Sequence, residues 1–119
     1  MKNKFVEYPK CSTCQKAKKW LQENNVEFED RNIVTETPTV AELTEWMKRS
    51  RQETKKWFNT SGLKYKAMNL KEKLTTMTEE EKIALLASDG MLIKRPIFVT
   101  DTQVLIGFKE EEWKIKIKM

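Results

Sequence analysis

Two cysteines separated by two residues are the side chains best suited to chemistry in this 119-residue sequence. They lie in the segment Tyr8-Pro9-Lys10-Cys11-Ser12-Thr13-Cys14. A thiol at the start of a helix meets unpaired backbone N–H groups and the positive end of the helix dipole, which favour the thiolate. We therefore predict that Cys11 is a nucleophile. Cys14 falls three residues later on the same helical face, so it is predicted to resolve a mixed disulfide formed at Cys11.

Two other interpretations of the cysteine pair stay open. A structural zinc ion takes four nitrogen or sulfur ligands, and the chain has no histidine and only two cysteines. A zinc site would therefore need a second chain. Alternatively, Cys14 continues the apolar positions Ala17 and Leu21 and could be an ordinary core residue. A C-x-x-C between a predicted strand and a predicted helix favours redox chemistry over both.

A second candidate is Arg95, in the segment Lys94-Arg95-Pro96. A guanidinium group offers a rigid fork of donors to a thiolate or an oxyanion. The other interpretation is a surface arginine before a proline that starts a strand. Gly107, after the last predicted strand, either allows a close backbone approach or simply ends the strand.

The composition excludes several classes of function. Without histidine there is no imidazole base and no histidine-ligated metal or haem. Four Trp and five Phe indicate a folded chain, and no apolar run approaches the ~20 residues that span a bilayer. No signal-peptide core follows the first residue, so we expect a cytoplasmic protein with reduced thiols. The net charge of +5 permits an anionic ligand or partner.

The elements that must position these residues start with a β-α-β unit. Residues 4–8 alternate and end at a proline, residues 12–24 have helical periodicity, and residues 26–29, prolonged through 32–34, alternate again. Such a unit places its two strands parallel, with a right-handed crossover.

A helical block follows. Thr39 with Glu42 and Thr78 with Glu81 fit the capping box, so each pair predicts a helix start. Between these two helices, residues 53–58 and 63–74 are predicted to form shorter ones. The tryptophans of the helical segments are expected in the core rather than on a binding surface: Trp20, Trp46 and Trp57.

The last part of the chain predicts a hairpin and a helix. Residues 96–99 and 104–107 are short apolar strands, and residues 109–113 form an amphipathic stretch with a helix or strand tail. The whole order predicts one α/β domain over residues 1–119. It resembles the thioredoxin fold (β-α-β … β-β-α), with thioredoxin-like parts at about 1–36 and 93–119 and a helical insertion at about 37–92.

Three basic clusters, at residues 16–19, 48–51 and 114–118, are expected to be solvated faces. Basic residues interleaved with exposed aromatics are not evident, so no direct nucleic-acid contact is expected.

Several motifs together resemble the arsenate reductase/Spx (ArsC-like) family. They are the start around Cys11, the Asn-Thr-Ser-Gly segment at 59–62, Leu-Ile-Lys-Arg-Pro-Ile at 92–97, and Val-x-x-Gly-Phe at 104–108. The resemblance implies a thioredoxin-like fold, a redox-active Cys11, and Arg95-Pro96 in the wall of the active site, where thioredoxin-type folds have a cis-proline. Candidate substrate-binding residues are Ser12, Thr13, Asn59 and Pro96.

The family has at least two functions. Glutaredoxin-linked arsenate reductases share Cys11 and Arg95, but their two further arginines align with Asn59 and Gly107 here. Spx-type regulators share the Cys-x-x-Cys switch and bind RNA polymerase, but their pattern has a glycine near residues 52–53, where this chain has none. The small Spx/ArsC-like branch with an Asn-Thr-Ser-Gly segment matches best.

These observations lead to one principal hypothesis and two alternatives. The principal one is a cytoplasmic, monomeric thiol–disulfide oxidoreductase-like protein that uses the Cys11–Cys14 couple with Arg95. It would bind no metal or organic cofactor and would take electrons from a thioredoxin- or glutathione/glutaredoxin-type donor. The alternatives are a redox-switched regulator that binds RNA polymerase and an arsenate reductase.

Overall fold

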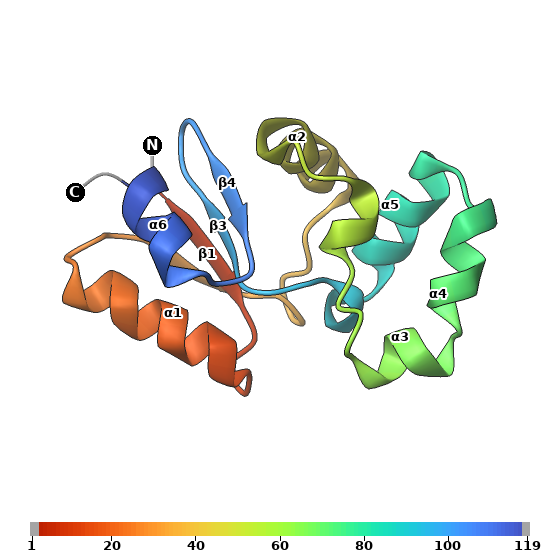
Figure 1. Ribbon diagram of the computed structural model, residues 1–119, viewed down its shortest axis with the longest axis horizontal. Coiled ribbons are helices and arrows are strands. Elements are labelled where there is room, and N and C mark those ends of the chain that lie inside the picture. Colours follow the sequence, from red (N-terminus) through yellow and green to blue (C-terminus); the bar gives the residue numbers. More distant parts are fainter. Residues whose placement is uncertain (1–2, 118–119) are drawn as a thin grey trace.

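A four-stranded mixed sheet lies at the centre of the computed structural model, which describes residues 3–117 (Figure 1). The strands are β1 (Lys4–Glu7), β2 (Glu29–Asn32), β3 (Ile97–Val99) and β4 (Val104–Ile106). Their order across the sheet is β2-β1-β3-β4. The β1 and β2 strands are parallel, whereas β3 is antiparallel to both β1 and β4.

The predicted β-α-β unit is present, with α1 (Ser12–Glu23) as its crossover helix. The second strand, however, begins at Glu29 rather than at Val26. The backbone N–H of Val26 donates to the carbonyl of Leu21 at 2.9 Å and so belongs to the end of the helix. Val26 packs against the core from the loop before β2, not from the sheet.

The predicted hairpin is also present. The last helix is α6 (Glu110–Lys116), so the tail after Trp113 continues the helix and does not form the alternative strand. Trp113 is fully buried and Ile117, four residues on, is 9% exposed, so the helical face that these two residues share packs on the sheet.

The insertion is built from short helical pieces. Both predicted capping boxes form: the N–H of Glu42 donates to Thr39 Oγ1, and the N–H of Glu81 to Thr78 Oγ1, each at 3.1 Å. In chain order the pieces are α2 (Val40–Ser50), η1 (Thr54–Trp57), α3 (Leu63–Ala67), α4 (Leu70–Lys73), η2 (Leu74–Thr76), α5 (Glu79–Ser88) and η3 (Gly90–Leu92), where η marks a 3₁₀ helix.

Two of the expected middle helices differ from the prediction. Residues 53–58 contain only the one-turn η1. Residues 63–74 are broken because Asn69 adopts the left-handed conformation, with φ of 53°, between α3 and α4. The expected single helix is therefore two short ones followed by a 3₁₀ turn.

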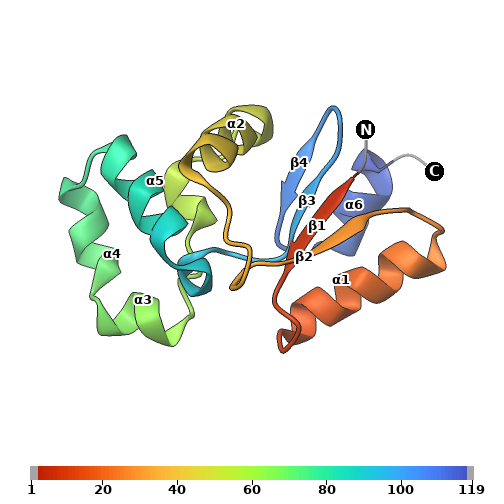
Figure 2. The same ribbon diagram turned by 180° about the vertical axis from the view of Figure 1, so that it is seen from behind.

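The two faces of the sheet carry separate apolar cores, because successive strand residues point to opposite sides. Phe5 of β1 packs with α1 and α6, whereas Val6 packs with the insertion. Figure 2 shows α1 and α6 on one side of the sheet and α2 and α5 on the other. As predicted, Trp20, Trp46 and Trp57 are core residues.

The insertion is joined to the sheet by backbone hydrogen bonds next to the predicted site. The N–H of Asn59 donates to the carbonyl of Leu92 at 2.8 Å, and the N–H of Lys94 donates to the carbonyl of Trp57 at 2.7 Å. These bonds hold residues 57–59 beside residues 92–94. Within residues 3–117, no helix has the length and apolar character needed to cross a membrane.

Candidate active site

Cys11 caps the N-terminus of α1. Its backbone is extended (φ −88°, ψ 120°), and its Sγ accepts a hydrogen bond from the N–H of Cys14 at 3.4 Å. Its own N–H donates to the carbonyl of Tyr8 at 2.9 Å, which closes the turn after β1. The Cys11 thiol is half-buried and faces the positive end of the helix, the position that the sequence indicated.

The surroundings of Cys11 favour its thiolate. Burial is the largest influence and by itself raises the pKa of the thiol. Hydrogen bonds from the side chain and backbone of Cys14, together with the charge and hydrogen bonding of Arg95, act in the opposite direction and prevail. The pKa of Cys11 therefore lies below its ordinary value.

Cys14 has the opposite character. It is fully buried in the first turn of α1. Burial is the main reason that the pKa of the Cys14 thiol rises to about 12, and the neighbouring Cys11 raises it further, against the backbone N–H of Tyr8 and the charge of Arg95. Of the two thiols, Cys11 therefore ionises first and Cys14 keeps its proton.

Arg95 forms the opposite wall of the site. The Arg95–Pro96 peptide bond is cis. The guanidinium carbon lies 5.2 Å from the centre of the Tyr8 ring, in a cation–π arrangement. The Nε and Nη1 atoms of Arg95 are buried and have no hydrogen-bond partner among the described residues. Because a buried, unpaired donor is costly, this guanidinium is suited to a ligand.

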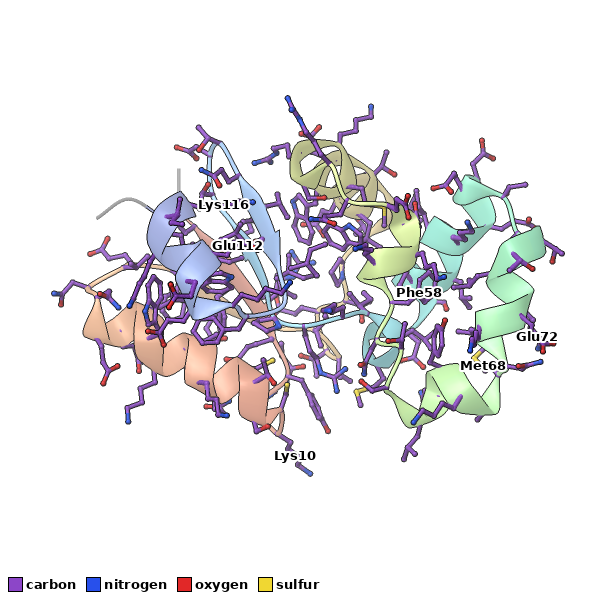
Figure 3. All side chains as sticks on the ribbon, viewed as in Figure 1. Lys10, Phe58, Met68, Glu72, Glu112 and Lys116 are labelled. Atoms are coloured by element: carbon purple, nitrogen blue, oxygen red, sulfur yellow. The ribbon has the colours of Figure 1, made fainter. Side chains whose placement is uncertain are left out.

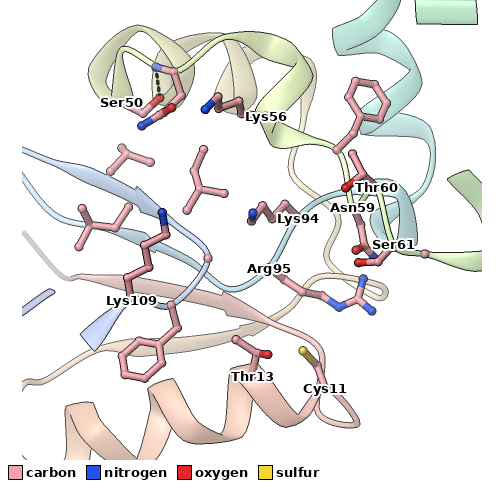
Figure 4. A pocket seen from close by; sticks show the side chains of 18 of the residues that line it. Cys11, Thr13, Ser50, Lys56, Asn59, Thr60, Ser61, Lys94, Arg95 and Lys109 are labelled. Atoms are coloured by element: carbon pink, nitrogen blue, oxygen red, sulfur yellow. Dashed lines mark hydrogen bonds between the residues drawn. The ribbon is translucent and has the colours of Figure 1, made fainter. Parts of the chain in front are cut away.

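A groove of about 950 Å³ runs between the thioredoxin-like part and the insertion (Figure 4). Cys11 and Arg95 line it together with Asn59 and Gly107, so the two positions where arsenate reductases have arginines belong to the same groove. An arginine at residue 107 would not fit easily. Gly107 has φ of +70°, and a Cβ there would lie 3.0 Å from Lys94 Cε.

The structure separates the four predicted substrate-binding residues into two pairs. Thr13 and Asn59 line the groove. Ser12 is exposed on the first turn of α1, and Pro96 is buried behind the groove, where its carbonyl accepts a hydrogen bond from Gly107 N–H at 2.8 Å. Neither Ser12 nor Pro96 contributes to the lining.

Five lysines that line the groove were missed by the sequence analysis: Lys56, Lys64, Lys94, Lys109 and Lys116. Lys94 adjoins Arg95 in sequence, which was the one local signal. The other four reach the groove only through the tertiary fold.

Most described lysines and arginines of the three basic clusters are exposed, as expected. Two of them make contacts within the chain: Lys18 pairs with Asp30 at 2.8 Å, and Arg49 donates to the Thr100 carbonyl at 2.6 Å.

A buried carboxyl group, Glu7, was also missed. It is 2% exposed at the end of β1, accepts a hydrogen bond from Gln15 Nε2 at 3.3 Å, and lies 3.6 Å from Lys18 Nζ. Burial, followed by the neighbouring Asp30, raises the pKa of Glu7 to about 7. Strand alternation places residue 7 on the same face as Phe5, which was the signal for burial.

The donor set of the groove suits an anion rather than a metal cation. Its charged lining is mainly basic, with one carboxylate, Glu112. Within residues 3–117, no three cysteine, aspartate or glutamate side chains gather into a group that could hold a metal ion.

Comparison with known proteins identifies relatives over nearly the whole chain. The sequence model of the ArsC family matches residues 6–115. The uncharacterized protein YusI of Bacillus subtilis (strain 168) is 50% identical over 110 residues, 92% of this chain and 93% of that protein. The regulatory protein MgsR of the same organism is 32% identical over 108 residues, 91% of this chain and 84% of that protein.

A solved structure agrees with the fold. The crystal structure of an ArsC-family-related protein from Bacteroides fragilis has 59% sequence identity and a TM-score of 0.93, and the match covers 97% of both chains. The resemblance indicated by the motifs is confirmed, and so is the α/β, thioredoxin-like fold class.

Proposed function

Since the chain belongs to the ArsC family, we propose that it is a thiol–disulfide oxidoreductase-like protein with Cys11 as its nucleophile and Cys14 as its resolving thiol. The observation that carries the proposal is the inequality of the two thiols. Cys11 has a lowered pKa beside Arg95, and Cys14 has a pKa of about 12 one helical turn away. An activated nucleophile next to a protonated second thiol is the arrangement that thiol–disulfide exchange requires.

The proposed reaction transfers two electrons from the cysteines to a disulfide, R–S–S–R. The Cys11 thiolate attacks one sulfur, forms the Cys11–S–S–R bond and releases R–S⁻, which takes up a proton. Cys14 then loses its proton and attacks Cys11 Sγ, which forms the Cys11–Cys14 disulfide and releases the second R–S⁻. Arg95 stabilises the Cys11 thiolate before the first step and again whenever Cys11 leaves as a thiolate.

A dithiol or thiol donor must then return the two electrons. We propose a thioredoxin- or glutaredoxin-type protein for this role, acting on a monomer in the cytoplasm without a metal or organic cofactor. The half-buried, groove-facing position of Cys11 supports attack by an external thiol at that sulfur.

Reduction of a small neutral disulfide in the presence of thioredoxin or glutaredoxin systems tests the proposal. We expect turnover by the wild type, none by Cys11→Ser, and accumulation of a covalent Cys11 adduct, seen by mass spectrometry, in Cys14→Ser. Lys10→Gln removes an exposed charge beside Cys11 and serves as the control (Figure 3). Turnover that persists in Cys11→Ser would contradict the assignment.

A redox-switched regulator is the second candidate. The supporting observation is the match to the regulatory protein MgsR over 91% of this chain. In this case formation of the Cys11–Cys14 disulfide would alter binding to RNA polymerase. Pull-down of polymerase by oxidised and reduced protein separates the candidates, and absence of binding in both states would eliminate this one.

Arsenate reduction has less support. Two of the three arginines expected for the oxyanion are replaced, by Asn59 and Gly107, and each charge-assisted contact is worth roughly 1.5–3 kcal/mol. We expect no arsenate-dependent turnover with thioredoxin or glutaredoxin systems. Measurable turnover would reinstate this function.

A further inference from the structure

The groove has two ends of different chemistry. At one end lie Cys11 and Arg95, which the proposed function uses. At the other end the side chains of Lys56, Lys94 and Lys109 point into the cavity from three directions (Figure 4). The proposed function gives these three lysines no role.

The three lysines come from separate parts of the fold. Lys56 belongs to η1 in the insertion, Lys94 precedes β3, and Lys109 caps α6. The backbone bond from Lys94 N–H to the Trp57 carbonyl, at 2.7 Å, fixes the first two segments together. Gly107 leaves room for the stem of Lys94, since a Cβ there would lie 3.0 Å from Lys94 Cε. The lysine end is thus assembled by the tertiary structure.

Acidic side chains of the described residues leave the positive charge of this end unneutralised. No carboxylate within residues 3–117 forms an ion pair with any of the three lysines. The one carboxylate in the lining belongs to Glu112, and its Oε1 pairs with Lys116 Nζ at 3.7 Å. A cleft lined by one sign of charge concentrates ligands of the other sign.

The size of the groove indicates the kind of ligand. About 950 Å³ is at the upper end of the range for small-molecule sites, which is roughly 300–1,000 Å³. A ligand that reaches both ends must present sulfur to Cys11 and negative charge to the lysines.

We propose that the substrate is a low-molecular-weight disulfide whose tail carries phosphate or several carboxylates, and that Lys56, Lys94 and Lys109 bind this tail. The inference rests on the proposed function, because Cys11 must attack the disulfide. The sulfur that bears the anionic tail joins Cys11 as a mixed disulfide, and the other sulfur leaves as a thiolate and takes up a proton. Attack by Cys14 then releases the anionic thiol and leaves the Cys11–Cys14 disulfide.

Three disulfides with increasing or different charge test the proposal. Pantethine is neutral, coenzyme A disulfide has the same thiol arm with phosphates attached, and the disulfide of γ-glutamylcysteine carries carboxylates. The rate of adduct formation at Cys11 is followed by mass spectrometry in the Cys14→Ser protein. We expect coenzyme A disulfide to react about tenfold faster than pantethine at low ionic strength, with the advantage shrinking as salt is added. The carboxylate probe distinguishes phosphate from carboxylate recognition.

Charge-matched variants assign the preference to the groove. The triple variant Lys56→Gln, Lys94→Gln, Lys109→Gln should lose most of the preference for coenzyme A disulfide while keeping its rate with pantethine. The control Lys66→Gln, Lys71→Gln, Lys73→Gln removes the same charge from exposed residues of α3 and α4 and should keep the preference. Equal rates for all three disulfides, or an unchanged preference in the groove variant, would overturn this inference alone. A Cys11 that reacts with none of them would overturn the proposed function as well.

Discussion

At the residue scale, two cysteines three positions apart have opposite properties because their surroundings differ. Cys11 is the helix cap, accepts the N–H of Cys14 and lies near Arg95, whereas Cys14 is fully buried behind it. The sequence predicted the helix cap from position alone. The apolar positions shared with Ala17 and Leu21 left burial of Cys14 as one interpretation. The sequence could not predict the unpaired nitrogens of Arg95 or its approach to Cys11, because these residues are more than 80 positions apart in the chain.

Arg95→Gln tests the electrostatic contribution of the guanidinium. Loss of this positive charge should raise the pKa of Cys11 and slow its alkylation at pH 7 about threefold to tenfold. The measurement is the rate of iodoacetamide labelling of Cys11. Lys10→Gln removes an exposed charge one residue from Cys11 and should leave the rate nearly unchanged. Equal slowing in both variants would contradict a specific role for Arg95.

Glu7→Gln tests the buried carboxyl group. Because its pKa is raised from 4.5 to about 7, Glu7 contributes stability that is fully present below pH 4.5 and is lost as the pH rises through about 7. The variant should therefore be more stable than the wild type at pH 8, by about 2 kcal/mol, and equally stable at pH 4.

Urea unfolding at the two pH values measures this difference. Glu27→Gln, at an exposed position, should differ little from the wild type at either pH. A destabilised Glu7→Gln at pH 8 would show that the carboxylate is favourably paired in the folded state.

At the element scale, the insertion supplies one wall of the site. Its two longest helices, α2 and α5, start at capping boxes that are local in sequence, and both were predicted. Sequence patterns failed where a turn hydrogen bond after a helix or a left-handed backbone conformation decides the structure. Asn69 breaks the expected helix at 63–74 through its left-handed conformation. The hydrogen bond from Val26 N–H to the Leu21 carbonyl keeps Val26 out of the sheet, so β2 begins later than expected.

Gly90→Ala tests the junction between the insertion and the sheet. A Cβ at residue 90 would lie 2.0 Å from the backbone oxygen of Ile33, which has little freedom to move. We expect destabilisation by about 3 kcal/mol, measured by urea unfolding. In Gly62→Ala the nearest atom, at 2.7 Å, is the Nδ2 end of the Asn59 side chain, so the cost should be smaller. Equal stability of the two variants would contradict this packing.

At the scale of the whole molecule, two cores share one thin sheet. The Cα radius of gyration is 14.0 Å, close to the ~13.5 Å expected of a single compact chain of this length. The division into a thioredoxin-like part and an insertion was predicted from element order, but whether the two parts form one domain stays a prediction. Sequence patterns could not show whether the two parts form one domain, because the adjacent residues Phe5 and Val6 pack into different cores.

Unfolding of tryptophan variants tests this prediction. Trp20 and Trp113 report on one core, and Trp46 and Trp57 on the other. In variants that keep only one pair, with phenylalanine at the other two positions, the fluorescence and far-UV circular dichroism transitions in urea should coincide. Separate midpoints in the variant that retains Trp46 and Trp57 would show that the insertion unfolds independently.

The central claim is that Cys11 is a thiolate activated by the helix cap and Arg95. The most direct test is the rate of Cys11 alkylation as a function of pH, with the labelled peptide quantified by mass spectrometry and Cys14 followed in the same digest. The structure predicts that the Cys11 rate reaches half its maximum below pH ~8.5, the value for an unperturbed thiol, and that Cys14 stays unlabelled across that range. A midpoint for Cys11 at or above ~8.5 would contradict the claim.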